Sequence, residues 1–320
     1  MPREMYDVAE CDDFCLAVIM AACATEAAAI QWCLKVGLLP RSRDCPSCGE
    51  AMRLSPNGKR FRCCRSGCRL ERTYKKGSFF EGQGLTIQDA VLLLWFWAKR
   101  EPSTHAQQMT GHSSHTLTDW YSFCRDICLR EMLRSPMQVG GPGHIVEIDE
   151  TSIKKKSKNN VGARHPDFWL FGGVDRTTNM FFASVVYEDR TKPRLSAEIR
   201  KFVLPGSHIM SDMWPSYVTA DGRHNIENNP YLEGMDYSHQ WVNHSTNFVN
   251  PANGAHTQRI EGVWEVRIKH RLKAFRGYPR HLLPSFIDEC LWRVWFFPPR
   301  PTPQQFMKGL VDAIKRHYVC

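Results

Sequence analysis

The sequence lacks any apolar run of the ~18 residues that a membrane span needs, since its longest candidates, 14–24 and 90–98, are too short. It has no basic start followed by an apolar stretch and a cleavage site, so we expect no secretory signal. It also has no internal repeat and no low-complexity tract. The absence of a Walker loop, a dinucleotide glycine fingerprint and a Gly-x-Ser-x-Gly elbow argues against P-loop, Rossmann and α/β-hydrolase enzymes.

The composition is that of an ordinary folded protein. The chain has 320 residues, 42% of them hydrophobic and 23% charged, which suggests roughly two domains. Its thirteen cysteines are odd in number and scattered along the chain. This usage argues against a secreted disulfide framework and favours a reducing compartment, with some thiols bound to metal.

The net charge of +9 is concentrated in two segments. Residues 41–80 hold eleven basic and three acidic residues, and residues 259–280 hold seven basic and two acidic residues. Residues 1–40 are acidic, with six acidic and two basic residues. Such concentration favours a nucleic-acid partner, although each basic segment alone is equally compatible with a solvated surface.

The first half of the chain is predicted to be mainly helical. Asp12 or Asp13 can cap a buried helix that runs to about Val36, with Gly37 as its left-handed C-terminal cap. A helix is expected over Thr86–Arg100. A short helix, Thr104–Met109, a break at Thr110-Gly111 and a longer helix to about Leu133 then form the pattern of a helix-turn-helix.

The texture changes to strands after a Gly/Pro linker at 140–143. Four β-like runs, a fifth near Tyr237–Asn243 and three helices predict a mixed sheet flanked by helices. The strands are Ile145–Thr151, Phe168–Val174, Met180–Tyr187 and His208–Met213, and the helices are Arg194–Val203, His256–Leu272 and Leu283–Phe296. We therefore expect an α+β multidomain chain divided into a helical segment (1–40), a zinc ribbon (41–80), a helix-turn-helix domain (81–139), a catalytic domain (144–297) and a tail (298–320).

Four cysteines have the spacing of a zinc ribbon. Cys45 and Cys48 form one pair, and Cys68 forms the second with Cys63 or Cys64; we prefer Cys63 because it follows a strand-like stretch. The segment has too few large apolar residues to fold alone, so structural Zn²⁺ would supply its folding energy. Its arginines suit phosphate contacts: Arg60, Arg62, Arg65, Arg69 and Arg72. The remaining cysteines, including the pair Cys124 and Cys128, are expected to be small core residues.

Carboxylates end two predicted strands and lie on one helix. Asp149 lies near the end of the first strand, where alternation puts Glu147 on the same face and Glu150 on the other, and Asp212 lies at the end of the fourth. On helix 256–272, Glu261 borders the apolar stripe of Ile260, Val263, Trp264, Ile268 and Leu272. Glu265 points further toward solvent and toward Lys269.

Convergence of Asp149, Asp212 and Glu261 would hold two divalent ions, Mg²⁺ or alternatively Mn²⁺. Two such ions about 4 Å apart activate the attacking oxygen and stabilise the leaving oxygen in phosphodiester displacement. Basic residues beside Glu261, namely Arg259 and Lys269, would then hold a polyanionic substrate.

The chain resembles DDE transposases of the Merlin superfamily, which are related to bacterial insertion-sequence transposases with an N-terminal zinc ribbon. The resemblance covers roughly residues 40–297 and rests on short motifs in order: Gly77-Ser-Phe-Phe-Glu81, Glu147-Ile-Asp-Glu-Thr151, Gly172-Gly-Val-Asp175, Ser211-Asp-Met-Trp-Pro-Ser-Tyr217, His239 with Val242-Asn-His-Ser245, Phe248-Val249 and His256-Thr-Gln-Arg-Ile-Glu-Gly-Val-Trp264. It implies an RNase H-like catalytic fold with Asp149, Asp212 and Glu261 as the metal-binding triad.

Some features stay open in the sequence. His239, His244 and His256 match family positions, and we favour structural hydrogen bonding over a role in orienting DNA or carboxylates. The lysines at 154–156, including Lys154 and Lys156, together with Lys158, suit a DNA-contacting loop or a nuclear-import patch equally well. Residues 221–233 match nothing assigned.

Three functions compete. The first is a cut-and-paste DNA transposase that binds terminal inverted repeats and target DNA as a homodimer or higher oligomer, in the nucleus of a eukaryote or the cytoplasm and nucleoid of a bacterium. The second is a host-domesticated DNA-binding protein without catalysis, and the third is an RNase H-like nuclease without strand transfer. The intact triad favours an enzyme, and the tandem DNA-binding modules favour transposition.

Overall fold

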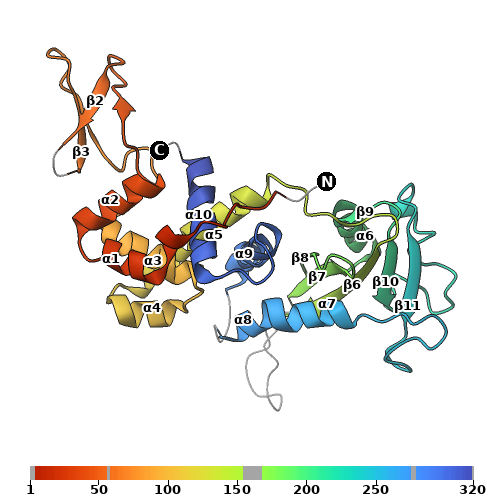
Figure 1. Cartoon of the computed structure of the whole chain (residues 1–320). Coiled ribbons are helices and arrows are strands. Elements are labelled where there is room, and N and C mark those ends of the chain that lie inside the picture. Colours follow the sequence, from red (N-terminus) through yellow and green to blue (C-terminus); the bar gives the residue numbers. More distant parts are fainter. Residues whose placement is uncertain (1–3, 56–57, 154–167, 275–278, 319–320) are drawn as a thin grey trace. The chain divides into compact units, whose positions relative to one another are not determined.

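The computed structural model describes residues 4–55, 58–153, 168–274 and 279–318, which form two compact units (Figure 1). Unit 1 is drawn from Met1–Glu131 and Phe296–Cys320, and unit 2 from Met132–Trp295. None of the helices within the described ranges is both long and apolar enough to cross a bilayer.

Unit 1 is built around one helix that is buried on nearly every side. This helix, α3, contacts helices from both ends of the chain, and its apolar residues run through Trp95, Phe96 and Trp97. Thr86 caps it, because its side chain accepts a hydrogen bond from the amide of Asp89. The helices of unit 1 are α1 (Leu16–Ala22), α2 (Glu26–Val36), α3 (Ile87–Ala98), α4 (Ser103–Thr110), α5 (Ser114–Met132) and α10 (Pro303–His317).

The single N-terminal helix expected from Asp12 or Asp13 to Val36 is wrong. A 3-10 turn, Asp12–Phe14, precedes α1, and α2 begins separately because the Thr25 side chain accepts a hydrogen bond from Ala28 N. The Thr25-Glu26 pair was the signal for this second start. The expected end is confirmed, since Gly37 adopts the left-handed conformation after α2.

The C-terminal residues 298–320, expected to be a tail, contain helix α10. Thr302 and Gln305 form a capping box at its start, with Pro303 in its first turn. The helix contacts α3, and its buried face includes Met307, Leu310 and Ile314. The helical spacing of apolar residues over 303–317 was the signal in the sequence for this helix.

Two predicted DNA-binding modules have the expected local structure. Strands β1 (Arg43–Asp44), β2 (Ala51–Leu54), β3 (Arg60–Cys63) and β4 (Glu71–Thr73) form an antiparallel sheet in chain order. Helices α4 and α5 follow one another across Gly111, which has positive φ, and the Ser113 hydroxyl accepts a hydrogen bond from Thr116 N at the start of α5. The predicted helix–turn–helix order is thus confirmed.

Unit 2 contains a five-stranded mixed sheet in the order β11-β10-β6-β7-β8. β10 and β11 run parallel to β6, whereas β7 is antiparallel to both of its neighbours. This is the RNase H-like arrangement implied by the resemblance, and the α+β fold class is confirmed. The strands are β6 (Ile145–Ser152), β7 (Trp169–Asp175), β8 (Phe181–Tyr187), β10 (His208–Asp212) and β11 (Ser238–Val242), each close to its predicted range.

Helices cover both faces of this sheet. Phe202 at the end of α6 (Lys192–Phe202) stacks on Phe182 of β8. On the opposite face, α7 (Gln258–Val263) contacts β6 and β7 (Figure 1). A small parallel pair, β5 (Val139–Gly140) with β9 (Val203–Leu204), lies within unit 2, so the chain passes between units at Glu131–Met132, before the expected Gly/Pro boundary at 140–143.

The helix predicted as continuous over His256–Leu272 is interrupted. It consists of α7, a π-helical turn at Trp264–Lys269 and α8 (His270–Ala274). Four residues of the predicted stripe, Ile260, Trp264, Ile268 and Leu272, are buried, whereas the fifth, Val263, is only half-buried. The last helix of the unit, α9 (Leu283–Trp295), matches its predicted range.

Candidate active site and cysteine cluster

Four cysteine side chains meet in the sheet of unit 1. The sulfurs of Cys45, Cys48, Cys63 and Cys68 all lie within 4.8 Å of one another, with Cys45 Sγ 3.6 Å from Cys68 Sγ and Cys48 Sγ 3.4 Å from Cys63 Sγ. Four thiolates at one point are the donor set of a structural tetrahedral Zn²⁺ site. The residues therefore fit this ion.

Two tight turns present these sulfurs. In the first, Gly49 N donates to Cys45 O, and in the second, Arg69 N donates to Arg65 O. Cys64 is exposed and lies outside the cluster, which supports Cys63 as the fourth sulfur. A backbone hydrogen bond at Leu70, followed by the neighbouring Cys45, lowers the pKa of the Cys68 thiol to about 7, so one of the sulfurs readily becomes the thiolate that metal binding requires.

The arginines proposed to contact DNA in this ribbon are exposed. Arg60 and Arg62 flank Glu71 at 3.0 and 3.7 Å, and their side chains retain 69% and 61% exposure. Arg69 is exposed on the second turn. These positions leave the guanidinium groups accessible to phosphate, and their DNA contacts stay a prediction.

In unit 2, Asp149 lies inside β6, three residues before its end, and Asp212 ends the adjacent parallel strand β10. Met210 of β10 pairs with Glu147 of β6, so continuing this register by two residues brings Asp212 beside Asp149. Burial raises the pKa of Asp149 well above its ordinary value, and the charge of Asp212 raises it further. The two carboxyl groups therefore share one electrostatic site.

An indole holds Asp149 in place. Trp264 Nε1 donates to Asp149 Oδ2 at 3.1 Å. Gly172, directly opposite Asp149 on β7, leaves room for this ring, because a Cβ there would lie 2.5 Å from Trp264 and 2.4 Å from Phe182 O. Glycine at position 172 thus allows the Trp264 ring to pack closely against β7.

One carboxylate oxygen of Asp212 has no hydrogen-bond donor among the described residues. This oxygen is Oδ1, and it is buried. Burial raises the pKa of Asp212, whereas His244 lowers it. A buried carboxylate oxygen without a donor is costly unless a cation or proton binds it, so the donor chemistry fits Mg²⁺.

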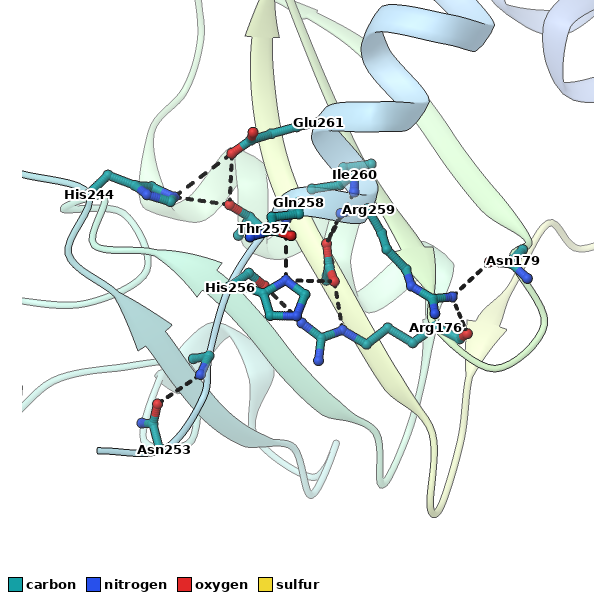
Figure 2. A network of polar contacts seen from close by, with 12 residues as sticks. Arg176, Asn179, His244, Asn253, His256, Thr257, Gln258, Arg259, Ile260 and Glu261 are labelled. Atoms are coloured by element: carbon teal, nitrogen blue, oxygen red, sulfur yellow. Dashed lines mark hydrogen bonds and ion pairs between the residues drawn. The ribbon is translucent and has the colours of Figure 1, made fainter. Parts of the chain in front are cut away.

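Glu261 lies on the first turn of α7 and is held from one side (Figure 2). Thr257 Oγ1 donates to Glu261 Oε1 at 3.2 Å, and His244 Nε2 lies 3.9 Å from the same oxygen. Glu261 acts electrostatically on Asp212. Among the described residues, however, the three carboxylates do not gather within 4.8 Å as the cysteines do, so the close approach expected of Glu261 to both aspartates is not reached.

Glu265 has the partner that the sequence predicts. Lys269 Nζ lies 3.0 Å from Glu265 Oε1, and Lys273 Nζ lies 2.9 Å from Oε2. Hydrogen bonds from Lys273 and Lys269 lower the pKa of Glu265. Both Glu265 and Lys269 are therefore engaged on the outer side of the helix.

Glu147 anchors the start of α7, a role that the sequence did not reveal. Its fully buried carboxylate accepts hydrogen bonds from Arg176 Nε at 2.6 Å, Arg259 N at 2.8 Å and Ile260 N at 3.1 Å. His256 Nδ1 lies 3.6 Å away. Because Glu261 follows within the same turn, this anchor fixes the backbone position from which the Glu261 side chain projects.

Glu150 and Tyr217 form a second unanticipated pair on the opposite face from Asp149. Burial raises the pKa of Glu150 to about 7, and the Asp212 charge contributes in the same direction. Burial also raises the pKa of Tyr217 well above its ordinary value, followed by the effect of Glu150. The fold therefore concentrates acidic groups near the ends of β6 and β10.

The three histidines have hydrogen-bonding partners within unit 2. His239 Nε2 lies 2.9 Å from Ser211 Oγ and its Nδ1 accepts from Ile226 N, while burial lowers its pKa to about 3. His239 thus ties the unassigned segment 221–233 to β10 as a neutral ring. His244 lies 3.0 Å from Thr257 Oγ1, and His256 lies beside Glu147.

The basic residues proposed around the carboxylates differ in their surroundings. Arg259 is exposed, and its Nη1 donates to Arg176 O and Asn179 Oδ1. Lys154 and Lys156 lie outside the described residues. DNA contacts of Arg259, Lys269, Lys154 and Lys156 stay predictions.

Comparisons with known proteins found one family-model match and several similar solved structures. Residues 139–294 match the family model of the ISXO2-like transposase domain. No curated protein matches the chain. The magnesium-bound HTLV-2 integrase catalytic core is similar in its trimeric form (17% identity, TM-score 0.28, 47% of this chain and 84% of that chain) and in its dimeric form (14%, 0.30, 54% and 99%).

A simian T-cell lymphotropic virus intasome in complex with PP2A regulatory subunit B56 gamma is also similar, with 15% identity and a TM-score of 0.31 over 64% of this chain and 76% of that chain. The family match spans the whole sheet of unit 2 with Asp149, Asp212 and Glu261. It confirms the resemblance to insertion-sequence transposases over residues 139–294, which match the ISXO2-like transposase domain.

Proposed function

We propose that the protein is a cut-and-paste DNA transposase of the Merlin superfamily, which binds transposon terminal inverted repeats and catalyses metal-dependent strand cleavage and strand transfer. The observation that carries this proposal is that Asp149 and Asp212 lie side by side on adjacent parallel strands, with an Asp212 oxygen to which none of the described residues donates a hydrogen bond. This pair lies within the matched transposase domain.

Different residues of unit 2 would bind the metal ions and orient the ligands. Asp149, held by Trp264, and Asp212 would provide carboxylate oxygens for two Mg²⁺ ions, with Mn²⁺ as an alternative, and Glu261 would complete the set. Bound there, the ions would activate the attacking oxygen and stabilise the leaving oxygen of a phosphodiester. His244 and Thr257 orient Glu261, and Glu147 fixes the backbone from which it projects.

Unit 1 would supply most of the DNA affinity. The cysteine cluster would hold structural Zn²⁺ and so fold the arginine-bearing ribbon, while the helix-turn-helix would read the terminal repeats. The protein would act as a homodimer or higher oligomer on transposon ends and target DNA, in the nucleus of a eukaryotic cell or the nucleoid of a bacterial one.

The test is incubation with candidate terminal inverted repeats and Mg²⁺, followed by analysis of end cleavage and joining. Asp149→Ala should reduce cleavage by more than about 10³-fold, because the carboxylate serves the transition state, and should leave end binding nearly intact. Glu261→Gln should also remove cleavage, whereas Glu265→Gln, its matched control one turn away, should retain most of it. Binding without cleavage by the unaltered protein would favour a domesticated DNA-binding protein instead.

A further inference from the structure

Arg190 is clamped between two tryptophan rings at the acidic end of the sheet in unit 2. Its guanidinium carbon lies 3.5 Å from the ring centroid of Trp169 and 4.5 Å from that of Trp214. Trp214 comes two residues after Asp212, and Trp169 pairs with Ser152, the last residue of β6. Arg190 thus lies where the strands carrying Asp149 and Asp212 end.

The backbone of Arg190 is fixed as firmly as its side chain. Ser216 Oγ donates to Arg190 O at 2.7 Å. On either side, Asp189 N donates to Val186 O, and the Asp189 carboxylate accepts from Thr191 N and Thr191 Oγ1. The cation therefore projects from a defined turn between β8 and α6.

The donors of this guanidinium are unused. Among the described residues, none accepts a hydrogen bond from it, and no carboxylate lies within ion-pair distance. It acts on Glu150 and Asp212 only through longer-range electrostatics. An arginine has five N–H donors in a planar fork, so stacking has fixed the plane of this group and left its edge for an acceptor from outside.

Arg280 in the same unit shows what a purely structural arginine of this kind looks like. It also stacks on two rings, at 4.9 Å from the Phe168 centroid and 4.6 Å from that of Tyr187. Unlike Arg190, it has an acidic partner within the chain, since its Nη2 lies 3.0 Å from Glu188 Oε2. The difference between the two lies in the missing acceptor, because both have aromatic support.

We propose that Arg190 binds the phosphodiester backbone of duplex DNA beside the Asp149–Asp212 pair, as a phosphate-binding residue that the motifs did not identify. A phosphate presents oxygens that match the guanidinium fork, and stacking removes part of the entropy that a free arginine loses on binding. The placement beside the catalytic carboxylates rests on the proposed transposase function, whereas the phosphate contact itself does not require catalysis.

The test is the salt dependence of DNA binding by the full-length protein, because each phosphate contact releases counterions. Binding of a fluorescein-labelled duplex of arbitrary sequence is measured by anisotropy from about 50 to 200 mM NaCl without Mg²⁺. Arg190→Gln should lower the slope of log K against log[salt] by about 0.9 and weaken low-salt binding roughly tenfold. Arg280→Gln, the matched control, should keep both values.

Arg190→Lys keeps the charge but loses the fork and the stacking, so it should keep the slope and bind about threefold more weakly at low salt. If a thermal melt shows that Arg190→Gln does not fold, the test instead compares the binding of Arg190→Lys with that of its control, Arg280→Lys. Binding equal to that of the unaltered protein would overturn the phosphate contact. If the variants show the expected differences in binding but the unaltered protein cleaves no DNA ends, the phosphate contact stands and the transposase function is contradicted.

Discussion

The cysteine cluster of unit 1 and the carboxylates of unit 2 differ in how completely the chain gathers them without an ion. The four sulfurs lie within 4.8 Å of one another, but the three carboxylates do not. Thiols are largely neutral at pH 7 and can crowd together, whereas ionised carboxylates repel. The backbone turns alone therefore bring the four sulfurs together, whereas the carboxylates need a bound cation to approach one another.

Two carboxylates on the same face of β6 repeat this contrast at closer range. Glu147 is saturated by Arg176 and by two backbone amides of α7. Asp149, two residues on, has one indole donor and acidic neighbours. The saturated group stabilises the frame, and the under-satisfied group is the one available for chemistry.

Removal of zinc should have the largest effect, because the ribbon has little other stabilisation. We expect one zinc ion per chain and loss of amide protection over residues 43–73 when a chelator removes it, while the sheet of unit 2 stays protected. Elemental analysis and hydrogen exchange measure both. Cys63→Ser should lose the ion and the exposed neighbour Cys64→Ser should keep it; the reverse pattern would refute the ligand assignment.

Substitution of the Glu147 anchor should have the next largest effect. Glu147→Gln leaves the largely buried Arg176 without its charged partner, and we expect the free energy of unfolding to fall by about 3–5 kcal/mol. Glu188→Gln is the control, since its pair with Arg280 is about half exposed and should contribute less than about 1 kcal/mol. Urea denaturation compares them, and equal losses would show that Glu147 is no anchor.

The sequence was informative wherever the signal was local. Cysteine spacing identified the four sulfurs, and alternation along 145–151 placed Asp149 and Glu150 on opposite faces. The helical projection assigned Glu265 to Lys269. Each of these depends on neighbours within a few residues, where backbone geometry alone determines the outcome.

Contacts between distant segments were out of reach. Glu147 and Arg259 are 112 residues apart, and Arg190 meets Trp169 and Trp214 from three different elements. The break at Thr25 and the π-helical turn at Trp264–Lys269 likewise depend on packing and capping that a continuous apolar pattern conceals. Residues that orient a site were therefore harder to predict than the residues that form it.

The smallest expected effect is the pH dependence of stability that arises from Asp149. The pKa of Asp149 is raised by burial, then by Asp212 and Glu150, so the folded protein holds this proton to higher pH than the unfolded chain does. Stability without divalent ions should then decline as pH rises above the ordinary pKa of an aspartate, because the folded state binds more protons in that range. Asp149→Asn removes this contribution together with its coupling to Asp212 and Glu150.

Denaturation of the metal-free protein and of Asp149→Asn across pH 4–8 tests the group, since both proteins keep every other titratable side chain, including His239. The two should match near pH 4 and differ by about 1–3 kcal/mol near pH 8, with the asparagine variant more stable. Adding Mg²⁺ at pH 8 should stabilise the unaltered protein, by an amount that grows with the ion concentration, and leave the variant nearly unchanged. Parallel pH profiles with no Mg²⁺ effect would mean that Asp149 is already satisfied within the fold, and the contrast with Glu147 would disappear.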